Sequence, residues 1–375
     1  MEMGIHMKIG CVKEIKRHEY RVGCTPASVA AYTAAGHKFY FEAGAGVASG
    51  FTDSDYQAAG AVIVENPADI WNDVDMMIKV KEPLESEYQY FREGLILYTY
   101  LHLAANEPLV KALTESKVIG VAYETLEENR ALPLLKPMSE VAGKLAVQEG
   151  AKYLEKPFGG FGILLGGVTG VAKAKVVVLG GGVVGINAAK VAIGFGANVT
   201  ILDKNLERLE YIDQIFNGTV QTMYSTDYEI HRQCQDADLV IGAVLIAGAA
   251  TPKLLKKAYL ADMKDGAVVV DVAVDQGGCF ETTHATYHDE PTYVIDGVTH
   301  YCVANMPGAV PHTSTIALTN ATLRYGLEIA NKGITTAIKE STVIQSAINT
   351  FAGEITFAGV AEAMNAQHTA ITSLV

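Results

Sequence analysis

The chain has 375 residues, of which 49% are hydrophobic and 19% charged, a globular composition with enough apolar mass for two domains. Its formal net charge is −13 and no block of lysine or arginine occurs, which argues against nucleic acid or an anionic membrane as a partner. The five cysteines are odd in number and form no CxxC pair, which argues against a disulfide framework or a zinc ribbon and favours a reducing compartment.

The first third of the chain alternates short apolar segments with amphipathic ones. Expected strands are residues 8–13, 37–42, 76–81, 95–100 and 118–123, and expected helices include residues 26–35 and 108–116. This alternation predicts a wound domain with a mostly parallel sheet and helices on both faces.

A long helix over residues 137–156, with Ser139 as its N-cap, is expected to lead into a second wound domain. Expected strands of that domain are residues 175–179, 198–202, 239–243 and 267–272. The tail after Pro307 is predicted to be helical, with one helix over about 313–331 that Gly333 ends. Such a tail is too short for its own core, so we expect it to pack on the first domain.

The predicted architecture is an α/β protein of two doubly wound, Rossmann-like domains joined by long helices, with a cleft between them. Residues 1–134 and 309–375 form the expected substrate-binding domain, and residues 135–308 the expected nucleotide-binding domain. Residues 1–10 show no signal-peptide pattern, and the longest apolar stretch, residues 239–250, is too short to cross a bilayer. We therefore expect a cytoplasmic protein. A mean hydropathy of +0.18 favours extra surface buried between subunits, with a large monomer core as the alternative.

The strongest local pattern is LGGGVVGINAA, with the spacing Gly180-x-Gly182-x-x-Gly185 between an apolar strand and a helix. The first glycine permits a tight turn, the second allows a pyrophosphate to approach the backbone, and the third allows the helix to pack on the strand. The helix N-terminus, from Val183, supplies amide donors. Asp203 ends the next strand, where a carboxylate accepts ribose hydroxyls and repels a 2′-phosphate, so the pattern favours NAD over NADP. A purely structural glycine turn is the alternative.

Polar residues near strand ends are the candidates for chemistry. Arg21 follows the first strand, Lys79 and Lys81 alternate in IKVKEP, and His102 follows the strand LILYTY. Ligands of wound sheets bind beyond the carboxyl ends of strands, so these residues can converge on one site. Each also has a structural alternative. Arg21 could lie in a solvated loop, the lysines could form an edge-strand charge pair, and His102 could be a hydrogen-bonded structural histidine.

Two carboxylates compete for a role near the end of AVVVDVAVDQGG. Asp275 is the catalytic candidate at the end of this strand, with a turn residue before two glycines as its alternative. Asp271 lies among valines, so we expect it to make a buried structural contact.

The sequence resembles bacterial L-alanine dehydrogenase along essentially its whole length. The resemblance rests on the blocks KEIKRHEYRVGCTP, IKVKEP, LHLA, ALPLLKPMSEVAGKLA, LGGGVVGINAA, ADLVIGAVLIAGAATPKL, VDVAVDQGGCFE and YCVANMPGAVPHTSTIALTNAT. It implies an NAD-dependent interconversion of L-alanine with pyruvate and ammonium, usually by a homohexamer. The NAD-binding subunit of proton-translocating transhydrogenase and the saccharopine dehydrogenases share the architecture more loosely.

The resemblance also assigns roles to individual residues. Arg21 and Lys81 match residues that bind the substrate, His102 matches the catalytic acid/base, and Asp275 matches a second catalytic group near the nicotinamide. Besides the glycine motif, NAD-contacting positions are matched by Ser139, Asp203, Arg208, Ser225, Val244, Leu245, Val272, Asp275, Asn305 and Met306.

Two departures from the family pattern stand out. His284 occupies a position where some relatives carry an arginine near the cofactor. Some relatives also hold a magnesium ion with a Glu/His pair, but this chain has Glu328 and Lys332, so we expect a helix ion pair and no metal. A transhydrogenase-like hydride carrier, a saccharopine-type dehydrogenase with a larger substrate and a catalytically silent NAD-binding protein remain the alternatives.

Overall fold

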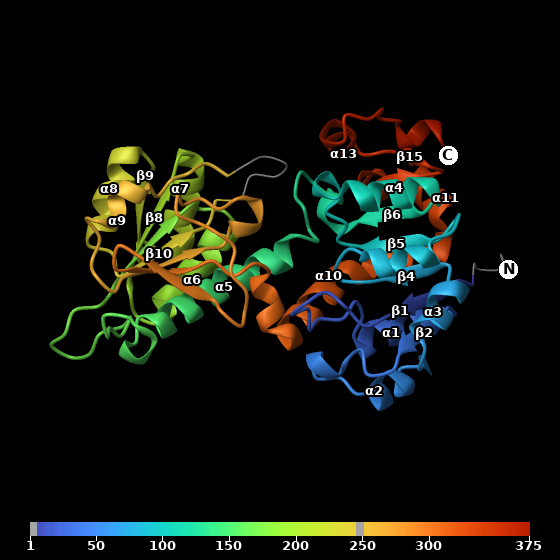
Figure 1. The fold of residues 1–375 in the computed structure, drawn as a ribbon, viewed down its shortest axis with the longest axis horizontal. Helices are drawn as coiled ribbons and strands as arrows, with labels where there is room; N and C mark the ends of the chain where they lie inside the picture. The colour runs from blue at the N-terminus through green and yellow to red at the C-terminus, as the bar shows by residue number, and fades with distance from the viewer. Residues whose placement is uncertain (1–5, 245–250) are drawn as a thin grey trace. The chain divides into compact units, whose positions relative to one another are not determined.

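The computed structural model describes residues 6–244 and 251–375 and divides the chain into two compact units. Unit 1 comprises residues 1–138 and 310–375, and unit 2 comprises residues 139–309. Each unit is an α/β body built around one sheet, as Figure 1 shows. The predicted α/β class with two wound domains is therefore confirmed.

Within the described residues, unit 1 holds an eight-stranded sheet of order β15-β14-β6-β5-β4-β1-β2-β3. The strands from β6 to β3 in that order run parallel, whereas β14 and β15 are antiparallel additions from the C-terminal tail. Their bounds are β1 Lys8–Cys11, β2 Lys38–Glu42, β3 Val62–Val64, β4 Met76–Ile78, β5 Ile96–Thr99, β6 Ile119–Ala122, β14 Ile348–Phe351 and β15 Glu354–Ile355.

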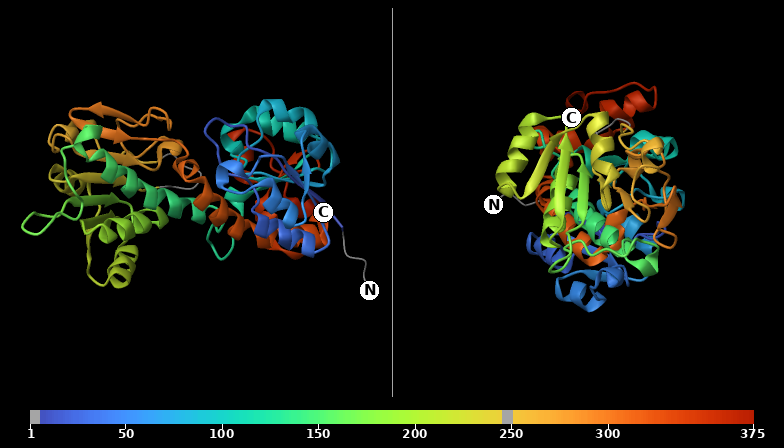
Figure 2. Two further views of the ribbon diagram at one scale, coloured as in Figure 1. Left: turned by 90° about the horizontal axis from the view of Figure 1, so that it is seen from below. Right: turned by 90° about the vertical axis from the view of Figure 1, so that its left-hand side faces the viewer.

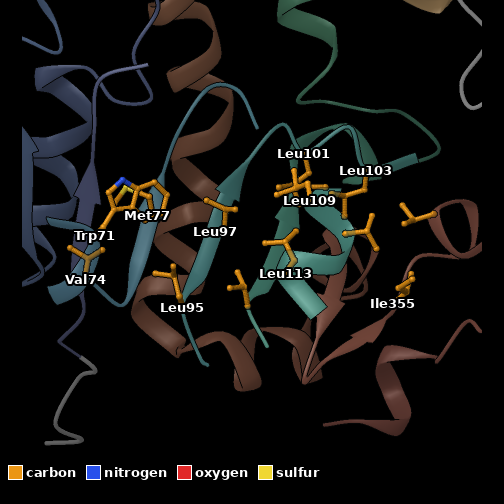
Figure 3. Packing of buried hydrophobic residues seen from close by; sticks show 14 of the residues in the cluster. Trp71, Val74, Met77, Leu95, Leu97, Leu101, Leu103, Leu109, Leu113 and Ile355 are labelled. Atoms are coloured by element: carbon orange, nitrogen blue, oxygen red, sulfur yellow. The ribbon is translucent and has the colours of Figure 1, made fainter. Parts of the chain in front are cut away.

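Helices cover both faces of this sheet. The helices of unit 1 are α1 Pro26–Ala34, α2 Asp53–Ala58, α3 Pro67–Asp73, α4 Glu107–Glu115, α10 Pro311–Lys332, α11 Ile334–Glu340, α12 Thr342–Ala347 and α13 Ala358–Ala363. Neighbouring residues of a strand point to opposite faces. Leu97 of β5 joins the apolar cluster that includes Trp71 of α3 and Leu113 of α4, drawn in Figure 3. Its neighbour Tyr98 instead donates its hydroxyl to the Thr322 carbonyl of α10, 2.9 Å away.

The C-terminal tail belongs to unit 1. Helix α10 packs on α1, and Figures 1 and 2 show the orange and red elements of the tail among the blue and teal elements of unit 1. The helix ends where Gly333 adopts a φ of +75°, as its stop signal predicts. The tail was predicted to be helical, but β14 pairs with β6 and extends the sheet, so that part of the prediction is wrong.

Within the described residues, unit 2 holds a seven-stranded sheet of order β12-β13-β11-β10-β7-β8-β9, parallel except for β12. The strands are β7 Lys175–Leu179, β8 Asn198–Asp203, β9 Val220–Tyr224, β10 Leu239–Gly242, β11 Val268–Asp271, β12 Thr292–Ile295 and β13 Val298–Tyr301. The helices are α6 Val183–Gly194, α7 Leu206–Phe216, α8 Asp227–Gln235 and α9 Lys257–Leu260, preceded by α5 Lys136–Tyr153, which begins in unit 1.

Short 3-10 turns complete the chain. They are η1 Val47–Ser49, η2 Glu85–Tyr90, η3 Leu103–Ala105, η4 Tyr123–Thr125, η5 Lys156–Phe158, η6 Val274–Gln276, η7 Met306–Ala309 and η8 Ile371–Ser373. Turn η3 directly follows His102, and turn η6 contains Asp275, two residues predicted to be catalytic.

Candidate functional site

Polar side chains gather at the carboxyl ends of neighbouring parallel strands in unit 1. In the order β6-β5-β4-β1, these strands are followed by Glu124, His102, Lys81 and Arg21. The chain runs outward from β1 to β3 and then returns to β4 beside β1, so the strand order reverses between β1 and β4. Such a reversal leaves a crevice at the carboxyl ends, where wound sheets bind ligands.

Arg21 is buried and held by a carboxylate from its own loop. Its Nε and Nη2 atoms donate to the two oxygens of Glu19, each at 2.7 Å, and Nη1 lies 3.0 Å from the Met138 sulfur. Burial alone would lower the pKa of Arg21, but the charge of Glu19, the hydrogen bond to it and the smaller effects of Tyr100 and Glu14 together outweigh burial, so the pKa rises. The alternative of a solvated loop arginine is therefore wrong, because the side chain is only 2% exposed.

Strand β4 ends at Ile78, so the two lysines of IKVKEP follow it and do not share a strand face as predicted. The edge-strand alternative is also wrong, because β4 lies between β5 and β1. Lys79 is fully buried and pairs with Glu14 and Glu87, both at 3.1 Å. The Glu14 carboxylate also accepts the backbone N–H groups of Val80, at 2.6 Å, and Lys81, at 3.3 Å. Lys79 is thus a structural residue that shapes the segment carrying Lys81.

His102 follows β5 in the left-handed backbone region, with a φ of 50°. Its backbone N–H donates to Glu124 at 2.6 Å, and its Nδ1 lies 3.3 Å from a Glu82 oxygen. The imidazole is 47% exposed and lies beside the buried Tyr100 ring, with centroids 5.9 Å apart. Burial raises the pKa of Tyr100, and the Arg21 charge offsets part of that rise, which places Arg21 in the same neighbourhood.

The glycine loop of unit 2 lies where the strand order reverses between β7 and β10. Gly180 has a φ of +106°, which disfavours any side chain. A Cβ on Gly185 would lie 1.9 Å from the Gly180 carbonyl oxygen, whereas a Cβ on Gly182 would meet nothing within 4 Å. The third glycine therefore serves close packing, and the second leaves open space above the amides that begin α6 at Val183. These are the roles that the spacing predicts for a dinucleotide-binding loop.

Asp203 ends β8 beside this loop. Its carboxylate accepts the N–H of Gly181 at 2.7 Å and that of Asn205 at 2.8 Å. A cavity of about 240 Å³ lies here, and four predicted cofactor residues, Gly180, Asp203, Ser225 and Val244, are among its lining residues. Pro252 and Leu254, which the sequence reading did not select, supply part of its apolar wall.

The remaining predicted cofactor residues occupy several positions in unit 2. Arg208 is on α7, Val272 follows β11, Asn305 has a φ of 60°, and Met306 opens η7. Ser139 lies inside α5, which starts at Lys136, so its prediction as an N-cap is wrong: a proline after Lys136 already suits the first turn. Leu245 lies outside the described residues.

Asp271, the last residue of β11, and Asp275, four residues later, have different environments. Asp271 is buried and accepts the N–H groups of Ala273 at 3.0 Å and Cys279 at 2.9 Å, together with the Thr283 hydroxyl. Its predicted structural contact is therefore confirmed. Asp275 does not end the strand as predicted, because β11 stops at Asp271; it lies exposed in the turn η6.

The residues that depart from the family pattern, Lys332 and His284, both contact neighbouring side chains. Lys332 donates to Glu328 at 3.1 Å, so the predicted helix ion pair is confirmed. His284 stacks on Tyr293 with ring centroids 3.7 Å apart. Across residues 6–244 and 251–375, no cluster of three or more histidine, cysteine or acidic side chains is arranged to hold a metal. Over the same residues, no helix combines the length and apolarity that crossing a membrane requires.

The sequence analysis did not identify the carboxylates that form hydrogen bonds with the candidate residues. Glu19 holds Arg21, Glu14 holds the backbone at Lys81, and Glu82 and Glu124 hold His102. They lie in the selected motifs KEIKRHEYR and IKVKEP or, for Glu124, after β6. The available signal was that acidic residues interleave the basic ones within those motifs.

Family models match nearly all of the chain. The alanine dehydrogenase/PNT N-terminal domain matches residues 10–142, and the C-terminal domain of the same family matches residues 146–358. The alanine dehydrogenase of Staphylococcus haemolyticus strain JCSC1435 is 55% identical over 367 residues, covering 97% of this chain and 98% of that protein. Alanine dehydrogenase 2 of Staphylococcus aureus strain USA300 is 54% identical with the same coverage.

Solved structures share the fold. A structure described as L-alanine dehydrogenase superposes with a TM-score of 0.93 at 48% identity, covering 96% of this chain and 99% of that one. A transhydrogenase from Sinorhizobium meliloti superposes with a TM-score of 0.82 at 24% identity, covering 93% of this chain and 100% of that one. The second similarity concerns the fold alone.

Proposed function

We propose, from the premise that the chain belongs to the alanine dehydrogenase/PNT family, that it is an NAD-dependent L-alanine dehydrogenase. It converts L-alanine, NAD and water into pyruvate, ammonium, NADH and a proton, and it runs the reverse reductive amination. The observation that carries the proposal is the group formed by Arg21, Lys81 and His102 at adjacent strand ends, in a chain with near-full-length identity to alanine dehydrogenases.

The substrate carboxylate is bound by Arg21 and Lys81. Glu19 accepts hydrogen bonds from Nε and Nη2 of Arg21, which fixes the orientation of the guanidinium. Lys81 adds a compact positive charge on a backbone held by Glu14. Two cations from separate strand ends fix the carboxylate, which orients the Cα–H bond of the substrate.

His102 moves the protons of the reaction. Bound NAD supplies the hydride acceptor, and loss of the Cα hydride leaves an iminium on the substrate. The imidazole takes a proton from the water that attacks this iminium. It then gives a proton to the nitrogen. As the carbinolamine hydroxyl loses its proton to water and its O–H electron pair forms the carbonyl, the C–N bond breaks and ammonia leaves with pyruvate. A histidine suits this role because it both accepts and donates protons near neutral pH.

NAD fits the residues of unit 2. The open space at Gly182 and the amides that begin α6 suit the pyrophosphate, and the Asp203 carboxylate suits the ribose hydroxyls. The cavity lined by Ser225 and Val244 suits the adenosine end. Val183 at the start of α6 belongs with these amides. Positions assigned by the resemblance add to this set: Ser139, Arg208, Leu245, Val272, Asn305 and Met306.

Asp275 is the second catalytic group in this proposal. Its exposed carboxylate on η6 is available to orient water or the departing ammonium.

We also propose that the protein acts in the cytoplasm as a homohexamer. All five cysteines are buried and unpaired, which suits a reducing compartment. Sedimentation velocity of the purified chain measures the assembly.

The test of the activity is NADH absorbance after purified protein is mixed with NAD and L-alanine at mildly alkaline pH. D-alanine and NADP are the matched controls. A rise specific to L-alanine and NAD supports the proposal. Tight NAD binding by calorimetry without NADH formation would overturn it and favour a transhydrogenase-like carrier or a saccharopine-type substrate.

A further inference from the structure

The backbone and the imidazole of His102 are held by two different carboxylates. Glu124, after β6, accepts the N–H of Leu101 at 3.1 Å and that of His102 at 2.6 Å. These bonds stabilise the left-handed conformation of His102, which is costly for a residue with a side chain. Glu82, after β4, contacts the ring itself at Nδ1. A merely solvated histidine would need neither contact.

Glu82 is built as an acceptor for the imidazole. Its side chain is only 11% exposed, and its two oxygens have separate partners: Lys16 Nζ contacts Oε1, and His102 Nδ1 lies 3.3 Å from Oε2. Burial would raise the pKa of Glu82, but the hydrogen bonds from His102 and Lys16 outweigh it and lower the pKa to about 2. The carboxylate therefore stays ionised at neutral pH and can only accept hydrogen bonds.

We infer that Glu82 is a positioning residue that keeps the Nδ1 proton on His102 and presents Nε2 as the proton-transferring atom. An ionised acceptor at Nδ1 selects the tautomer in which Nδ1 carries the hydrogen and Nε2 carries the lone pair. It also stabilises the imidazolium that forms when Nε2 takes a proton. Glu82 contributes no atom to the reaction, and it acts through the imidazole alone. This inference rests on the proposed function, because it assigns His102 the proton transfer.

The test compares Glu82→Gln with Lys16→Met under the alanine and NAD assay. The amide is nearly isosteric but uncharged, and its NH₂ group can hold His102 in the wrong tautomer. We expect E82Q to lower kcat at least about 10- to 100-fold, by analogy with the losses seen when a carboxylate that orients a metal-bound histidine is removed. The KM values for L-alanine and NAD should stay within about threefold of the wild type, because Arg21 and the glycine loop are untouched.

Lys16→Met separates this role from a structural one. If Glu82 served only to tether the loop of Lys16 and Arg21, both variants would raise the KM for L-alanine and behave alike. We expect instead that K16M keeps kcat within about threefold, because the contact of Glu82 with His102 remains. Equal behaviour of the two variants, or an E82Q enzyme with wild-type kcat, would overturn the inference.

Further measurements distinguish failure of the Glu82 inference from failure of E82Q to fold and from failure of the proposed function. If E82Q does not fold, Glu82→Asp carries the test: it keeps the charge but is one methylene shorter, so it should lose kcat with little change in KM, and wild-type kcat in E82D overturns the inference. If the wild-type chain forms no NADH from L-alanine, the proposed function fails and the inference falls with it. An active wild type with an unimpaired E82Q removes the inference alone.

Discussion

Replacing Lys79 by methionine tests whether this residue is structural. The ammonium has no exposed surface and lies 3.1 Å from both Glu14 and Glu87, whose side chains are 2% and 7% exposed. The uncharged variant leaves two buried carboxylates close together without a cation. Removing one partner of a buried pair costs about 3–5 kcal/mol, because the remaining charge is neither solvated nor compensated.

That loss lowers the folding equilibrium constant by roughly two to four powers of ten. Urea unfolding followed by circular dichroism, at fixed protein concentration, measures it for Lys79→Met against the wild type. Lys8→Met is the matched control, because its ion pair with Asp73 is solvent-exposed, so its urea midpoint should barely change. The double variant Glu14→Gln with Lys79→Met should recover part of the loss, since it removes one of the uncompensated charges.

The loss of folding stability caused by Lys79→Met should depend on pH. Burial raises the pKa of Glu14 even beside Lys79, and removing the cation raises that pKa further. The folded variant then binds more protons than the unfolded chain, so its stability increases as the pH falls from about 7 toward about 5. A variant within about 1 kcal/mol of the wild type at neutral pH, or a loss independent of pH, would refute the assignment of Lys79 to a buried charge network.

Three further predictions concern the proposed site. His102→Ala should lower kcat by about two to four powers of ten and leave the affinity for NADH nearly unchanged. Steady-state kinetics measure kcat, and fluorescence titration measures NADH binding. Near-normal turnover would exclude His102 from proton transfer. Gly185→Ala should abolish tight NADH binding, because its Cβ would lie 1.9 Å from a carbonyl oxygen, whereas Gly194→Ala, with nothing within 4 Å, should bind normally. Asp203→Ser should raise kcat/KM for NADP relative to NAD, since a hydroxyl does not repel a 2′-phosphate; an unchanged ratio would contradict that role of Asp203.

Strands rich in valine and isoleucine could be predicted from the sequence because burial on both faces produces continuous apolar runs. The first strand of unit 2 was predicted at residues 175–179, where β7 lies. Strand β3, Val62–Val64, was missed because it is a short edge strand with no fully buried residue. Strand β14, Ile348–Phe351, was missed because its partner β6 is more than two hundred residues away, as the pairing of Thr350 with Gly120 shows. Pairing over that distance leaves no local pattern.

The sequence by itself determined the glycine loop and the acidic strand end of unit 2. Their spacing follows from backbone geometry over a short stretch of chain, where a turn, a close packing and a carboxylate must recur in fixed order. It also placed Arg21, Lys81 and His102 near strand ends. What those side chains contact was decided only by the tertiary structure.

The fold made Lys79 a buried structural residue and supplied the carboxylates that hold the others. Glu82 and Glu124 reach His102 from the strands on either side of β5, across 20 and 22 residues of chain. For Glu82 the only local signal is its place beside Lys81 in IKVKEP, and Glu124 lies in no motif selected from the sequence. Their roles arise because parallel strands bring their carboxyl ends together, so that residues far apart in sequence become neighbours of one imidazole.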